Sequence, residues 1–451
     1  MAVIDAGPTT QPPVFRFNPR RVRFSLDRTR SAELWDEIGE SARTDGLVRF
    51  KFAGDTCWVV TDPSWVRQVL TSPPDVVGRS GSFRKLSVII GHSLLTTEGA
   101  EHRLRRRQMQ PAFHRDRLRV YADSIVAAAT TTDTEWQAGA RVHMDRDMAA
   151  LTMDAIGRAV LGLDGRALAP SVGKALENLM RAMPLMFLPK VDWLADKPVP
   201  GFGWLRRSIA HLVEVAERGA RTSEAELVRS LRTAVEDLPQ LSDDDVRDEL
   251  LTLLMAGHET TAVTLTWLWW LLDQHPDVGE RMREEIAQVV GDRDPTYDDV
   301  ERLHYTQAVV AETLRVRPAA WINERQVTGE LRLGAFRPAP GDLILIPSWV
   351  IQRDDRWWTE PLRFRPQRWL DAEGCYDEKT PGQPRGAYLP FGAGAHACIG
   401  QSFAWTEAVL ALAILVPKWR PTLASDARVG IRASVTLRPA HGMPMVLDAR
   451  D

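Results

Sequence analysis

The chain has 451 residues, of which 44% are hydrophobic and 26% are charged, and its formal net charge at pH 7 is −3. This composition is typical of a globular protein with a large core, and the near-balance of charge gives no indication of a nucleic-acid partner. The three cysteines, Cys57, Cys375 and Cys398, lack the paired spacing of a disulfide framework or a zinc site. A reducing compartment fits this cysteine usage, so we expect a cytoplasmic protein.

The N-terminal stretch carries prolines and polar side chains where a signal peptide or a membrane anchor needs an apolar run. We therefore expect residues 1–13 to form a flexible tail and the protein to have no membrane anchor. No repeat period or low-complexity linker divides the remainder, so residues 14–451 are expected to form one domain.

Residues 46–70 predict a hairpin of two short strands, followed by a helix that opens after Asp62-Pro63. A second strand-rich stretch spans 327–352, and a third lies near the C-terminus. The pattern between these stretches is helical. The sequence therefore predicts a mainly α fold with small β-sheet portions.

The most informative predicted helix begins at Ser242, whose S-x-x-D pattern with Asp245 is typical of an N-cap, and runs to His275 before Pro276. At about 1.5 Å per residue it is about 50 Å long, enough to cross the molecule. Residues 250–272 are apolar nearly all round, which indicates a buried helix.

The middle of this helix, AGHETT at 256–261, places polar groups where the rest is apolar. Gly257 costs about 1 kcal/mol relative to alanine, and burying Glu259 without a partner costs more. In one interpretation, Thr260 and Thr261 bond back to carbonyls one turn earlier and Glu259 pairs locally. In the other, the stretch is a gap that faces a ligand, with Glu259 and Thr260 as a proton-handling pair.

A second predicted helix, at 306–318, carries Glu312 and Arg315 three residues apart on one face. Apolar neighbours surround this pair, so we expect it to be buried and to fix local architecture. The same spacing recurs where a surface pair or coincidence is the simpler interpretation, at Glu40/Arg43, Glu226/Arg229, Glu280/Arg283 and Glu360/Arg363.

Cys398 follows a glycine-rich loop, FGAGAHACIG at 391–400, and precedes an apolar stretch that predicts a helix ending at Pro417. A thiolate is favoured at a helix N-terminus, where unsatisfied N–H groups and the helix dipole meet it. The glycines at 392, 394 and 400 allow the backbone to approach something bulky.

These motifs together resemble those of the cytochrome P-450 heme-thiolate monooxygenases. The loop at 391–400 is similar to the family's heme-binding signature, AGHETT to its oxygen-activating helix, and Glu312-x-x-Arg315 to its E-x-x-R pair, which Arg368 in FRPQRW completes. The resemblance runs from about residue 30 to the C-terminus. It implies a soluble bacterial-type member with the cytochrome P-450 fold, in which heme lies between the long central helix and the cysteine loop.

The resemblance also implies roles for individual residues. Cys398 would be the axial iron ligand, the arrangement that favours O–O cleavage in this family, and Phe391 would cover its sulfur. Thr260 would hydrogen-bond dioxygen, and Glu259 would relay protons. The other residues expected to bind heme b are His102, Arg106, Arg325, His396, Gly392, Gly257 and Ala256. His396 stands where the family more often has arginine, so its hold on a propionate would depend on protonation.

The implied activity is a dioxygen-dependent oxidation of an apolar organic substrate, with electrons from separate redox partners. We expect a ferredoxin or flavodoxin, with its reductase, to dock on the arginine-rich segment from Arg103 to Arg119, in which Arg103, Arg105 and Arg107 would form a solvated face. Met180, Met183, Met186 and Phe187 would lie in the roof over the heme. The alternatives are a heme-thiolate peroxygenase or isomerase, which needs no dioxygen, and a non-catalytic heme sensor.

Overall fold

The computed structural model describes residues 13–15, 31–52, 54–186, 203–237 and 242–450. Residues 1–12 of the predicted tail lie outside this range. The helices are α2 (Ser31–Ser41), α3 (Pro63–Thr71), α4 (Gly81–Ile90), α5 (Gly99–Met109), α6 (Arg115–Glu135), α7 (Met144–Ile156), α8 (Gly165–Met186), α10 (Gly203–Thr222), α11 (Glu226–Asp237), α12 (Asp243–Gln274), α13 (Pro276–Val289), α14 (Tyr297–Val300), α15 (His304–Val316), α16 (Ser348–Ile351) and α17 (Gln401–Leu415).

The strands of the described chain are short. They are β1 (Leu47–Phe52), β2 (Asp55–Val60), β3 (Val77–Gly78), β4 (Arg141–His143), β5 (Asn323–Val327), β6 (Leu343–Ile346), β7 (Trp419–Leu423), β8 (Ile431–Ala433), β9 (Leu437–Pro439) and β10 (Pro444–Ala449). Four single-turn helical pieces complete the elements: η1 (Gln110–Phe113), η2 (Gly157–Leu161), η3 (Pro366–Trp369) and η4 (Gly394–His396).

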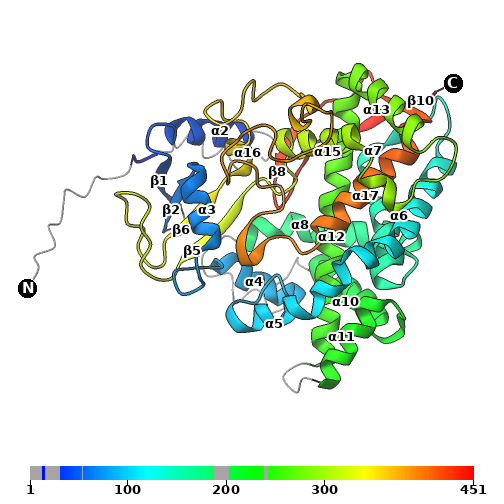
Figure 1. Ribbon diagram of the computed structural model, residues 1–451. Helices are drawn as coiled ribbons and strands as arrows, with labels where there is room; N and C mark the ends of the chain where they lie inside the picture. The colour runs from blue at the N-terminus through cyan, green and yellow to red at the C-terminus, as the bar shows by residue number, and fades with distance from the viewer. Residues whose placement is uncertain (1–12, 16–30, 53, 187–202, 238–241, 451) are drawn as a thin grey trace, which may run out of the picture.

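A mixed sheet and a large helical part lie side by side (Figure 1). The sheet has the order β1-β2-β6-β5-β3, in which β2 and β6 are parallel and the other neighbours are antiparallel. Two smaller sheets, β4-β10-β7 and β8-β9, come from the C-terminal strands and one internal strand. The mainly α fold with small β portions is therefore confirmed.

The long helix α12 passes through the helical part (Figure 1). A capping box at Ser242 and Asp245 starts it, as predicted, and Pro276 begins the next helix. From Leu250 to Leu272 its side chains are buried except at residues 255–257, 259–260 and 270. The exposure is thus concentrated in the AGHETT stretch. Among the described residues, no helix has the length and hydropathy needed to cross a membrane.

Two other local predictions are confirmed, whereas the stretch 327–352, predicted to be rich in strands, holds β6, only the last residue of β5, and the helix α16. Strands β1 and β2 pair as a hairpin, and Asp62 caps α3 by accepting bonds from the Ser64 and Trp65 backbone N–H groups at 2.9 and 3.2 Å. The apolar helix after the cysteine loop is α17.

Glu312 and Arg315 form a fully buried ion pair in α15, with Nη2 to Oε1 at 2.7 Å. Arg368 of η3 donates its Nε–H to the same carboxylate at 3.1 Å, so the predicted triad is present. The Arg315 guanidinium also donates to the carbonyls of Gln352 and Pro361. These bonds satisfy both charges, as a buried pair requires, and they fix the segment that leads to the cysteine loop.

Candidate functional site

The cysteine loop is held by its own backbone and by α3. The Cys398 N–H donates to the Phe391 carbonyl at 2.8 Å, which closes the loop. Gly392 and Gly394 have φ of 69° and 73°, the left-handed region that favours glycine. A Cβ on Gly394 would lie 2.0 Å from the Leu70 carbonyl oxygen of α3. The close approach that Gly394 allows is therefore to protein backbone.

The Cys398 thiol lies among protein atoms but keeps an exposed surface. Desolvation raises its pKa, while the Gly400 backbone N–H and the positive charge of Arg106 lower it. These last two groups stabilise a thiolate, the form of cysteine that binds a metal. The side chain of Phe391 is partly buried and packs against the main hydrophobic core.

Five basic side chains from four separate parts of the chain gather beside this loop. His102 and Arg106 come from α5, Arg325 from β5, His396 from η4 and Arg79 from the segment after β3. Sequence reasoning placed the first four at this site and missed Arg79. In the sequence, Arg79 directly follows the apolar stretch Val76–Gly78, and this position is the local feature that could have indicated a buried arginine.

The Arg79 guanidinium has a central place in this basic cluster. It is 5% exposed, and its Nη2 lies 2.9 Å from His396 Nδ1. Burial and then the charge of Arg325 lower its pKa to about 9, while the charge of Glu98 opposes this. The side chain of Glu98 also accepts the Arg79 backbone N–H.

The two histidines of the cluster are stacked, with ring centroids 4.1 Å apart. Burial and then Arg79 lower the pKa of His396 to about 2, and the same causes lower that of His102 to about 4. Both rings are thus neutral at pH 7 in this arrangement, and the charged partner expected at His396 is supplied by Arg79 beside it.

Helix α12 contributes Ala256, which is exposed, and Thr260, which is partly exposed. The Thr260 hydroxyl donates to the Ala256 carbonyl at 2.8 Å, which is the back-bonded arrangement that the sequence left open. Because its hydrogen is used in this bond, Thr260 Oγ1 has only acceptor lone pairs left in this arrangement.

Gly257 was expected to make room for a ligand, and the structure assigns it a different contact. A Cβ at this position would lie 2.2 Å from Ile156 Cδ1 of α7. The absence of a side chain at Gly257 therefore allows α12 and α7 to approach closely. Within this stretch, the side chain of Ala256 is exposed and that of Thr260 is partly exposed.

Glu259 does not pair locally. Its carboxylate accepts from the Thr436 hydroxyl at 2.7 Å and from Arg438 Nε at 2.9 Å, and it forms an ion pair with the same guanidinium. Both partners belong to the β8–β9 hairpin, far away in the sequence. Sequence reasoning missed them because neither stands in a motif.

The expected solvated arginine face is wrong for Arg105, which is 4% exposed and bound to carboxylates of α5 and α12. Three further arginines of the segment form ion pairs at its surface: Arg115 with Glu301, Arg117 with Glu226 and Arg119 with Asp298. Arg103 and Arg107 are exposed as expected. The side chains of Met180, Met183 and Met186, and all of Phe187, lie outside the described residues.

The residues present fit a heme group. A cysteine sulfur is the ligand expected for heme iron in this family, and Arg79, Arg106 and Arg325 form a basic cluster. The charge of Arg325 lowers the pKa of Arg79, and all three arginines lower the pKa of His396. Mutual repulsion of this kind is relieved by anions such as the carboxylates of heme propionates. Exposed Ala256 offers an apolar contact in the middle of an otherwise buried helix.

Comparison with known proteins agrees with this fit. A family model described as cytochrome P-450 matches residues 28–432. Cyclooctatin synthase of Streptomyces melanosporofaciens is 32% identical over 417 residues, 88% of each chain, and pentalenene oxygenase of Streptomyces avermitilis is 31% identical over 414 residues, 90% of each.

A further relative, cyclooctat-9-en-7-ol 5-monooxygenase of Streptomyces melanosporofaciens, is 32% identical over 384 residues, 83% of this chain and 82% of that one. The crystal structure of the cytochrome P450DA heme domain shares the fold, with a TM-score of 0.84 over 98% of both chains at 23% identity. The chain therefore belongs to the cytochrome P-450 family and is a monooxygenase of that family.

Proposed function

We propose that the protein binds heme b through the Cys398 thiolate and inserts one oxygen atom of dioxygen into an apolar polycyclic substrate of the terpenoid type. The observation that carries the heme assignment is the gathering of Arg79, Arg106 and Arg325 beside the exposed Cys398 thiol. We further propose one domain over residues 14–451 and a cytoplasmic location.

When bound, heme supplies the activation of dioxygen, and the chain supplies the surroundings. Arg79, Arg106 and Arg325 hold the propionate carboxylates, with His102 and His396 as hydrogen-bonding neighbours. Gly400 N–H stabilises the sulfur charge.

On the α12 side, Ala256 provides an apolar wall. Thr260 Oγ1 offers an acceptor to a proton-bearing ligand, and Glu259 carries protons toward Thr260 when its carboxylate exchanges Arg438 for water.

The substrate class is supported by the names of two relatives, which denote the oxidation of cyclooctat-9-en-7-ol and of pentalenene. Each name denotes an unsaturated compound with at most one hydroxyl group. We therefore propose a cyclic hydrocarbon or its mono-alcohol. Candidate compounds are ranked by the spectral shift that each produces in the ferric holoenzyme.

Electrons are proposed to come from a ferredoxin or flavodoxin with its reductase. The exposed arginines Arg103 and Arg107 lie on α5, the helix that contacts the cysteine loop through Arg106, whose Nη1 donates to the Ala397 carbonyl at 2.7 Å. A docking face at these arginines attracts an acidic carrier, and this attraction weakens above roughly 0.15 M salt.

The test is turnover of a substrate found by the spectral screen. With a ferredoxin, its reductase and NADPH, we expect product that depends on dioxygen and carries oxygen from ¹⁸O₂. Product formed with peroxide alone, and none with dioxygen, supports the peroxygenase alternative. Heme binding and a substrate shift with no product under either condition supports the sensor alternative.

A further inference from the structure

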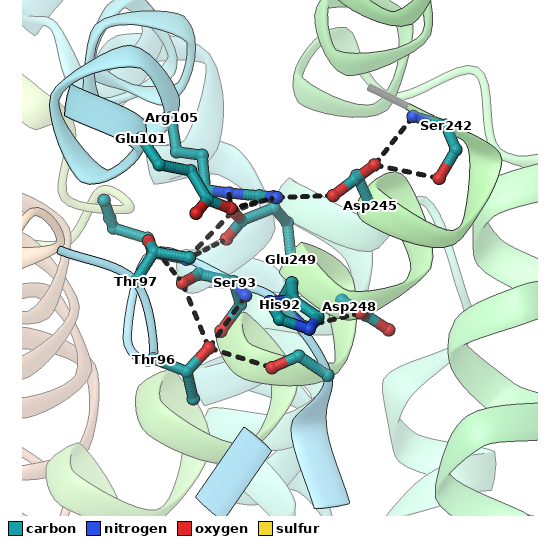
Figure 2. Close-up of polar contacts among 12 residues, drawn as sticks. His92, Ser93, Thr96, Thr97, Glu101, Arg105, Ser242, Asp245, Asp248 and Glu249 are labelled. Carbon is teal, nitrogen blue, oxygen red and sulfur yellow. Dashed lines mark hydrogen bonds and ion pairs between the residues drawn. The ribbon is translucent and has the colours of Figure 1, made fainter. Parts of the chain in front are cut away.

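Helix α5 has a second group of contacts on the face next to His102 and Arg106. Figure 2 shows its side chains meeting the loop 91–97 and the first turns of α12. Arg105 lies at the centre of this group and is 4% exposed. No residue of the group contacts Cys398 or stands in a motif of the cysteine loop.

One guanidinium serves three carboxylates here. Arg105 Nη2 lies 2.5 Å from Asp245 Oδ1 and 2.9 Å from Glu101 Oε1, and its Nη1 lies 3.3 Å from Glu249 Oε1. Their side chains are 16%, 49% and 3% exposed respectively, so Glu249 is the one most withdrawn from water. We call this group, Arg105 with Glu101, Asp245 and Glu249, the joint between α5 and α12. With all four groups ionised, the joint has one positive and three negative charges.

Glu249 and the adjacent Asp248 hold the loop that precedes α5. The Leu94 N–H donates to both oxygens of Glu249 at 2.9 and 3.0 Å, and the His92 N–H donates to Asp248 Oδ2 at 2.8 Å (Figure 2). Gly91 has φ of 63°, and a Cβ there would lie 1.7 Å from Asp248 Oδ2. The loop thus lies directly on consecutive carboxylates of α12.

The neighbouring face of α5 reaches the cysteine loop. The His102 ring stacks on His396, and Arg106 donates to the carbonyl of Ala397, the residue before Cys398. His102, Arg106 and Arg105 all belong to α5, a single helix of 11 residues. A shift of α5 at the joint therefore moves the groups that face the heme.

We propose that Arg105 and Glu249 are positioning residues for the heme: the Arg105 guanidinium, bound to Glu249, Glu101 and Asp245, fixes α5 on the head of α12 and so sets where His102 and Arg106 lie. This inference rests on the proposed function, in which His102 and Arg106 lie at the heme propionates. Removing Arg105 leaves three carboxylates close together without their cation, which favours movement of α5 and the loop 91–97 away from α12.

The proposal has a pH signature. Burial raises the pKa of Glu249 from 4.5 to about 7, and Asp245 adds to this, while the Leu94 N–H and Arg105 oppose it. The charged groups around Glu249 are Arg105, the carboxylates of Glu101 and Asp245 that share its guanidinium, and the adjacent Asp248, which pairs with Arg247. Opening the joint hydrates Glu249, so the closed joint holds its proton more tightly than the open one.

The sign of the pH effect follows from this difference. Between pH 4.5 and about pH 7 the closed joint binds more protons, so raising the pH favours opening by up to about tenfold per unit. For pKa values of about 7 closed and 4.5 open, the opening equilibrium rises about tenfold from about pH 6 to about pH 8.

Two measurements on the ferric holoenzyme test the proposal. The first is heme transfer to excess apomyoglobin, followed by absorbance, in wild type, Arg105→Gln, the double variant Arg105→Gln/Glu249→Gln, and Arg103→Gln as an exposed control on the same helix. We expect Arg105→Gln to speed transfer at about pH 8 by about tenfold or more, the double variant to recover most of this, and the control to match wild type.

The second measurement is hydrogen exchange at the Leu94 amide. In wild type its protection falls about tenfold between about pH 6 and about pH 8 after correction for the intrinsic rate, and in Glu249→Gln it does not change with pH. This measurement needs no Arg105 variant, so it stands if Arg105→Gln fails to fold.

Unchanged heme transfer in Arg105→Gln, no recovery in the double variant, or the same Leu94 pH dependence in wild type and Glu249→Gln would each overturn the proposal. Failure of the proposed function is distinct, because it is failure of the wild-type protein to bind heme or to show a thiolate-ligated spectrum.

Discussion

The contact between Gly257 and Ile156 makes a quantitative prediction about the packing of α12. In Gly257→Ala, the new Cβ lies 2.2 Å from Ile156 Cδ1 unless the helices or the side chain move, and Ile156 is only 3% exposed. Overpacking of this kind costs about 1–3 kcal/mol, and replacing a helical glycine by alanine regains about 1 kcal/mol. We expect a net loss of about 1 kcal/mol in the free energy of unfolding.

Two further variants make this prediction specific. Ile156→Val removes the Cδ1 atom, so it should relieve Gly257→Ala and give a coupling energy of about 1–2 kcal/mol in a double-mutant cycle. Gly173 of α8 is the matched control, because nothing lies within 4 Å of a Cβ built there. Gly173→Ala should stabilise the protein by up to about 1 kcal/mol.

The assay is urea unfolding of the ferric holoenzyme, followed by circular dichroism, with heme content measured in each variant. A coupling energy near zero between Gly257→Ala and Ile156→Val would refute the packing role. Loss of heme or substrate binding in Gly257→Ala at unchanged stability would restore the expectation that this glycine makes room for a ligand.

Three other predictions concern the same region. Arg438→Gln should lower the free energy of unfolding by about 2 kcal/mol through loss of its bonds to Glu259, and Arg438→Lys by less; equal loss in both would refute a specific role of the guanidinium fork. Thr260→Ala should keep heme and substrate but divert electrons to peroxide, whereas an unchanged product yield per electron would show that the back-bonded hydroxyl is only structural. Burial raises the pKa of Glu407 well above 4.5, so wild-type stability should fall with pH above about 4.5, by up to about 1.4 kcal/mol per unit, relative to Glu407→Gln; parallel pH curves would contradict this.

The sequence was most informative where chemistry and local structure share one short segment. The loop 391–400 combines its glycines, Cys398 and the start of α17 within a few residues, so a local pattern identifies it. The capping box and apolar run likewise predict α12. The burial of Glu312 follows from its apolar neighbours in α15.

The residues that sequence reasoning missed are brought together only by the fold. Arg79 reaches His396 from a segment more than 300 positions away, and Arg438 reaches Glu259 from the C-terminal hairpin. Arg105 stands in a run of arginines, where an exposed side chain is the usual expectation. Its burial depends on carboxylates of α12, which the local sequence around Arg105 does not indicate. Long-range pairs of this kind have no local period or motif to predict them.

Binding of heme iron by the Cys398 thiolate underlies the whole proposed function. Its most direct test is the absorbance spectrum of the dithionite-reduced protein under carbon monoxide, in wild type and in Cys398→His. We expect the red-shifted band of thiolate-ligated heme in wild type and its loss in Cys398→His with heme still bound. A wild-type spectrum without that band, or the same band in both proteins, would contradict it.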